Sequence, residues 1–110
     1  MPHFMIKVKY TAASVKGMIA NPHDRQKAAA AAIEAVGGKL LSFYMAFGHD
    51  DVISIYEAPD AITAAALAMA VGGAGGLSSV ETVPLLTMAE ATAAMKKAST
   101  VQAAYKAPSA

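Results

Sequence analysis

Cysteine is absent from the chain, and charged residues are few. Without cysteine there can be no disulfide, no thiol nucleophile and no thiolate metal site. Asp, Glu, Lys and Arg make up 15% of the 110 residues and leave a formal net charge of +1. Binding to nucleic acid or to an anionic membrane needs a clear basic excess. We therefore expect neither partner.

The sequence also contains no stretch that is typical of a membrane-spanning helix or of a signal peptide. The most apolar stretch, residues 61–71, is too short to cross a bilayer and ends in glycines. Met1-Pro2-His3 has no basic segment of the kind that opens a signal peptide. These absences predict a soluble, cytoplasmic protein.

Apolar residues, in contrast, are abundant, at 55% of the chain. A single domain of this length has a small interior. Part of its apolar surface is therefore expected to face a partner subunit or a cavity. We expect a homo-oligomer.

Hydrophobic periodicity predicts a mixed succession of strands and helices. Phe4, Ile6 and Val8 alternate with Met5 and Lys7, which is typical of a half-buried strand. The later elements are predicted as a helix at Pro22–Val36 capped by Asn21, strands at residues 41–47 and Val52–Glu57, a helix at Ala61–Val71, a strand at Val80–Leu86 that Pro84 places at an edge or at a bulge, and a helix at Ala89–Ala98 capped by Thr87 with Glu90.

This order predicts an α+β fold of ferredoxin-like βαββαβ type. Its four-stranded antiparallel sheet carries both main helices on one face, and the C-terminal helix is an addition. We expect one domain over residues 1–98 and a flexible tail over residues 99–110.

The strand pattern also predicts which side chains lie under the helices. The inward set is Phe4, Ile6, Val8, Leu41, Phe43, Met45, Ile53 and Ile55, and the outward set includes Lys7, Lys9, Ser42, Tyr44, Val52, Ser54 and Tyr56. The outward face would be left bare by the helices. Two such sheets commonly pack face to face and enclose a pocket.

Several short segments resemble the GYD-domain family, which is placed with the dimeric α/β-barrel proteins. They are Lys9-Tyr10-Thr11, Asp24-Arg25, Gly37-Gly38-Lys39-Leu40, and the signature segment Phe47-Gly48-His49-Asp50-Asp51-Val52 followed by Glu57-Ala58-Pro59-Asp60. The resemblance covers about residues 4–87 and implies the fold, but it implies no activity. Asp50 stands where the family motif has its tyrosine, and only Gly48 and Asp51 keep their places.

Candidate binding residues come from the outward face and from the first helix. Lys9, Tyr44 and Tyr56 are expected on the bare face, where a lysine among tyrosines can have a lowered pKa suited to polarising a ligand. Arg25 could reach an anionic ligand or a carboxylate such as Glu57. The same residues could instead form a dry subunit interface, where tyrosine is common.

The signature turn offers the side chains of His49, Asp50 and Asp51 within a few residues. Adjacent side chains in one turn rarely converge on an ion, so we interpret Gly48, His49 and Asp51 as a structural turn and predict no metal site. No catalytic residue or cofactor can be named from the pattern.

The leading hypothesis is a domain that binds or converts a small molecule in a pocket between the sheets of an oligomer. The alternative is a structural or regulatory oligomer without catalysis. A tautomerase-like isomerase that uses the amine of Pro2 as a base is the least favoured, and the sequence does not decide whether the chain is an enzyme.

Overall fold

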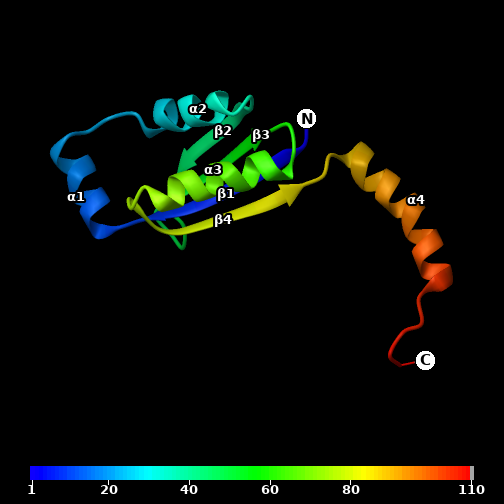
Figure 1. The fold of residues 1–110 in the computed structure, drawn as a ribbon. Helices are drawn as coiled ribbons and strands as arrows, with labels where there is room; N and C mark the ends of the chain where they lie inside the picture. The colour runs from blue at the N-terminus through cyan, green and yellow to red at the C-terminus, as the bar shows by residue number, and fades with distance from the viewer. Residues whose placement is uncertain (110) are drawn as a thin grey trace.

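A computed structural model describes residues 1–109. Four strands form one antiparallel sheet in the order β2-β3-β1-β4; they are β1 (His3–Tyr10), β2 (Lys39–Met45), β3 (Val52–Glu57) and β4 (Leu77–Leu85). The helices α2 (Arg25–Ala35) and α3 (Ala61–Gly73) cover the same face of the sheet (Figure 1). The predicted ferredoxin-like arrangement is confirmed, with β1 at the centre and β4 at an edge.

Each of the four helices starts at a residue whose side chain accepts a backbone N–H. The caps are Thr11 for α1 (Ala12–Ala20), Asp24 for α2, Asp60 for α3 and Thr87 for α4 (Met88–Ala104). The expected cap at Asn21 is wrong, because the Asp24 carboxylate accepts from the N–H groups of Gln26 and Lys27. Helix α2 therefore begins three residues later than predicted.

The second half of the chain follows the prediction more closely. The capping box of Thr87 and Glu90 is confirmed, although α4 runs to Ala104 and so extends into the expected tail. Pro84 lies in the edge strand β4, as expected for a residue without an N–H. No helix among residues 1–109 combines the length and the apolar character needed to span a membrane.

The face assignment of β3 is wrong in the prediction. Val52, Ser54 and Tyr56 point under the helices and are buried, whereas Ile53 lies on the other face and is 38% exposed. The register explains the difference, because Tyr56 pairs with Phe4 and Val52 pairs with Val8. Directly paired residues share a face, and a shift of one residue exchanges the two faces of a strand.

The expectation that Leu41 lies under the helices is also wrong, because β2 has a bulge between Leu40 and Ser42. Leu41 has no partner on β3 and is 43% exposed, so it does not lie in the core. The Ser54 hydroxyl donates to the carbonyl oxygen of Ser42 at 3.0 Å. This bond gives the Ser42 carbonyl a hydrogen-bond partner at the point where the bulge interrupts the β2–β3 pairing.

The face opposite α2 and α3 is called here the helix-free face. Its members are paired with one another across the four strands; they are His3, Met5, Lys7, Lys9, Lys39, Ser42, Tyr44, Ile53, Ile55, Glu57, Ser79, Glu81, Val83 and Leu85. Ser42 and Tyr44 lie on this face as predicted. So do Lys7 and Lys9.

Candidate functional site

A hollow of about 120 Å³ lies between the sheet and the two helices that cover it. Its walls are mainly apolar; they include Ile6, Val8 and Val52 from the sheet, Ala28, Ala29 and Ala32 from α2, and Leu67 and Val71 from α3. Alanine side chains are too short to fill the layer between a helix and a sheet. The alanine run that favours the helix therefore also leaves the space that we call the helix–sheet hollow.

Arg25 and Tyr10 lie at one end of this hollow. Arg25 is the first residue of α2 and is half-buried, with Nη1 3.2 Å from Nε2 of His23. No carboxylate among residues 1–109 forms an ion pair with its guanidinium. Two more open hollows beneath α1 also include both Arg25 and Tyr10, so three depressions meet at these two residues.

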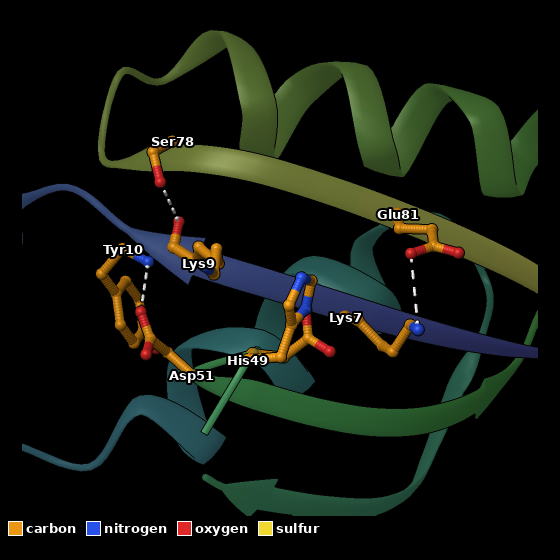
Figure 2. Close-up of polar contacts among 8 residues, drawn as sticks. Lys7, Lys9, Tyr10, His49, Asp51, Ser78 and Glu81 are labelled. Atoms are coloured by element: carbon orange, nitrogen blue, oxygen red, sulfur yellow. Dashed lines mark hydrogen bonds and ion pairs between the residues drawn. The ribbon is translucent and has the colours of Figure 1, made fainter. Parts of the chain in front are cut away.

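Asp51 holds the end of β1 on which Tyr10 stands. Its Oδ2 atom accepts from the N–H of Tyr10 at 2.8 Å (Figure 2). Its own N–H donates to the carbonyl of Val8 at 2.8 Å. The backbone N–H that this carboxylate accepts is therefore not in its own turn but 41 residues away in the chain. Asp51 therefore ties the β2–β3 turn to the central strand beside the hollow.

Of the rest of the signature turn, Gly48 and His49 are exposed and Asp50 is half-buried. His49 is exposed and lies 3.5 Å from the Oδ1 of Asp50, with which it pairs when protonated. Across the described residues 1–109, no three His, Cys, Asp or Glu side chains gather closely enough to hold a metal ion.

Lys9 and Tyr44 both belong to the helix-free face, as predicted, but they are not neighbours. Strand β3 lies between their strands, so two strand spacings, roughly 10 Å, separate them. Lys7 is the lysine with a partner, because it forms an ion pair with Glu81 at 3.4 Å (Figure 2). Tyr44 is 70% exposed and has no hydrogen-bond partner within the described part of the chain.

Tyr56 lies in the core and not on the helix-free face. Its ring stacks on Phe4 with 5.6 Å between centroids, and its hydroxyl has no partner among the described residues. Burial raises the pKa of Tyr56. Glu57 lies on the helix-free face, opposite His3 and Lys39, and so on the other side of the sheet from Arg25.

The structure thus distributes the four predicted ligand-binding residues over three places. Arg25 borders the helix–sheet hollow, Tyr56 is in the core, and Lys9 and Tyr44 lie apart on the helix-free face. Neither Tyr10 as a site residue nor the hollow itself was predicted from the sequence. The signal that could have indicated them is the alanine run of α2 above a strand of large apolar residues.

Pro2 lies at the far end of β1 from Tyr10. Its carbonyl accepts the N–H of Ala58 at 3.1 Å, and the residue is exposed. The eight residues of β1 span roughly 26 Å, so Tyr10 and Pro2 are at opposite ends of the strand. A base at Pro2 cannot act on a molecule held beside Arg25.

Comparison with known proteins adds the family and the fold. The model of the GYD domain matches residues 4–95. Among solved structures, the one titled "Crystal Structure of MtbAldR" is similar with a TM-score of 0.58 and 16% identity over 78% of this chain. This chain spans 53% of that protein, about half of its length. No curated protein sequence matches significantly. Because the family model covers most of the chain, the protein belongs to the GYD domain family.

Proposed function

We propose that the domain binds a small carboxylate with an apolar body in the helix–sheet hollow. The observation that supports this proposal is the Arg25 guanidinium, which borders an apolar hollow and has no ion-pair partner within residues 1–109. A binding site of this kind combines apolar walls with a few polar groups that orient the ligand.

The size of the hollow limits the apolar body. An apolar cavity of about 150 Å³ is large enough to bind benzene, and the hollow here measures about 120 Å³. It suits a single aromatic ring or a short branched aliphatic chain. The more open depressions next to Arg25 leave room for the ligand's polar end.

The charge of Arg25 selects the other end of the ligand. A guanidinium binds a carboxylate through two parallel hydrogen bonds. The backbone N–H groups at the start of α2 do not compete for this role, because the Asp24 carboxylate already accepts from Gln26 and Lys27. The anion would therefore be held by the side chain and not by the helix end.

Ligand-observed NMR and calorimetry with acetate, isovalerate and benzoate test the proposal. We expect Arg25→Gln, which keeps a good helix former, to weaken benzoate binding by about tenfold or more. Ala29→Leu, which fills the hollow and removes no charge, should do the same. Benzyl alcohol, which lacks the carboxylate, should bind weakly to the wild type.

Lys9→Met is the matched control, because it removes a positive charge from the helix-free face. Loss of binding in Lys9→Met with retention in Arg25→Gln would place the ligand between the sheets of two subunits instead. If none of the carboxylates binds the wild type more tightly than Arg25→Gln, the proposal fails. The structural or regulatory oligomer would then be the better hypothesis.

We also propose that the helix-free face is covered by a second copy of the chain. Met5, Ile53, Ile55, Val83 and Leu85 form an apolar centre on this face, and the helices that bury the opposite face leave it unprotected. Packing of two sheets face to face would remove this surface from water.

A charge placed in the middle of the helix-free face should prevent this association. We expect Ile53→Glu to sediment as a folded monomer at micromolar concentration, where the wild type sediments as an oligomer. Ile62→Glu is the control, because Ile62 is exposed on α3 away from the helix-free face. A monomeric wild type would refute the proposed association.

A further inference from the structure

Helix α4 stands away from the rest of the domain. Its 17 residues include none that is buried, and it makes no extensive contact with another helix or strand (Figure 1). At 1.5 Å per residue it is roughly 25 Å long. Such a helix exposes its whole circumference to water in a single copy of the chain.

The dimensions of the molecule show how much surface this arrangement exposes. The radius of gyration is 17.6 Å, whereas a compact domain of this length has about 13 Å. The accessible surface is 7455 Å², about 1,800 Å² more than the roughly 5,700 Å² of a compact monomer of this mass. Stable obligate dimers bury about 1,000–2,500 Å² from each chain, so the excess is of the size that a second copy would cover.

Isolated helices shorter than about 12–15 residues are only marginally stable in water, and α4, with 17 residues, is only slightly longer. Most helices in proteins are stabilised by packing of an apolar face. Since α4 has no such packing within residues 1–109, its stability requires another surface.

The connection from β4 to α4 is short and ends in a capping box. Two residues, Leu86 and Thr87, connect β4 to the helix. The N–H of Thr87 donates to the Glu90 carboxylate at 2.9 Å, and the N–H of Glu90 donates to the Thr87 hydroxyl at 3.2 Å. These bonds also lower the pKa of Glu90. The capping box satisfies N–H groups of the first turn and so favours the start of the helix at Met88.

The exposed large apolar side chains of α4 gather on one side of the helix. Met88, Met95 and Val101, with Tyr105 at the C-cap, are exposed and fall within an arc of about 140° around the helix axis, which we call the apolar strip. Ala93 and Lys96 lie on the other side of the helix. Only Leu86, which is exposed, and Thr87 separate α4 from Leu85 of the helix-free face, so the two apolar surfaces are close together in the chain.

We infer that α4 is an arm that packs its apolar side on a second copy of this chain, in the same contact that covers the helix-free face. The inference rests on the self-association proposed above. The family match ends at residue 95, so the outer part of the arm lies beyond the segment common to the family. The second copy is favoured over an unrelated partner because one chain carries both unprotected apolar surfaces, and because the excess surface is of the size that a dimer contact buries.

Sedimentation equilibrium and circular dichroism of the full chain test the inference. Met95→Glu places a charge in the apolar strip, and we expect it to raise the dissociation constant of the oligomer about tenfold or more. Its helical signal should also fall on dilution. Ala93→Glu introduces the same charge on the opposite side of the same helix and should change the dissociation constant less than about twofold.

Ile53→Glu separates failure of this inference from failure of the proposed association. If Ile53→Glu dissociates the oligomer but Met95→Glu behaves like Ala93→Glu, the arm is not part of the contact and the inference is wrong. If the wild type is monomeric at all concentrations, both proposals fall. The ordered body of the domain does not depend on α4, so both helix variants should melt as folded proteins.

Discussion

Replacing Tyr56 by alanine is expected to destabilise the domain by about 3–5 kcal/mol, the range for deletion of a fully buried aromatic ring. Tyr56 is the largest side chain with essentially no exposure, and it stacks on Phe4 in the centre of the core. A domain of this kind is stable by only about 5–15 kcal/mol. Urea denaturation should therefore show a large fall in the midpoint, or a chain that is unfolded before urea is added.

Tyr56→Phe separates the contribution of the aromatic ring to stability from that of the hydroxyl group. The hydroxyl is buried without a partner among residues 1–109, and removal of an unsatisfied polar group costs little or even stabilises. We expect the urea midpoint of Tyr56→Phe to equal or exceed that of the wild type. A loss of more than about 1 kcal/mol would mean that the hydroxyl bonds a partner in solution.

The wild type and Tyr56→Phe should differ in how much stability they lose at alkaline pH. Burial raises the pKa of Tyr56 in the folded state above its ordinary value, so the folded state binds the proton more tightly than the unfolded state does. The corresponding stability is fully present below the unfolded pKa, near 10, and is lost as the pH rises through the folded value. The wild type should therefore lose more stability than Tyr56→Phe above pH 10.

Gly38→Ala is the second substitution with a large expected effect. A Cβ atom at position 38 would lie 2.5 Å from the carbonyl oxygen of Glu57 and 2.9 Å from Cγ2 of Ile33. Neither neighbour can move easily, because Glu57 is paired with Lys39 in the sheet and Ile33 is the buried residue of α2. We expect a loss of about 3 kcal/mol, at the upper end for overpacking.

Gly48→Ala is the matched control for Gly38→Ala. No atom lies within 4 Å of a Cβ at position 48, and its backbone is not left-handed. The same change should therefore be close to neutral there, or slightly stabilising through the unfolded chain. Equal urea midpoints for the two variants would show that the α2–β2 connection is looser than the structure indicates.

Local features of this protein could be predicted from the sequence because their causes lie within a few residues. The capping box needs only Thr87 and Glu90, and the alternation of Phe4, Ile6 and Val8 assigns the inner face of β1. The order of the elements then leads to the ferredoxin-like topology, because few arrangements of four strands and two crossover helices are allowed.

Other features were decided only by contacts between distant segments. Strand β3 is apolar on both faces, so its alternation could not indicate that Tyr56 is buried and Ile53 is not; the pairing with β1 decided this. The hollow beside Arg25 likewise exists only because short alanine side chains of α2 pack over β1 and β3. Periodicity reports which residues of one segment share a face, whereas the choice of face and the space left between layers depend on residues that the chain brings together from far apart.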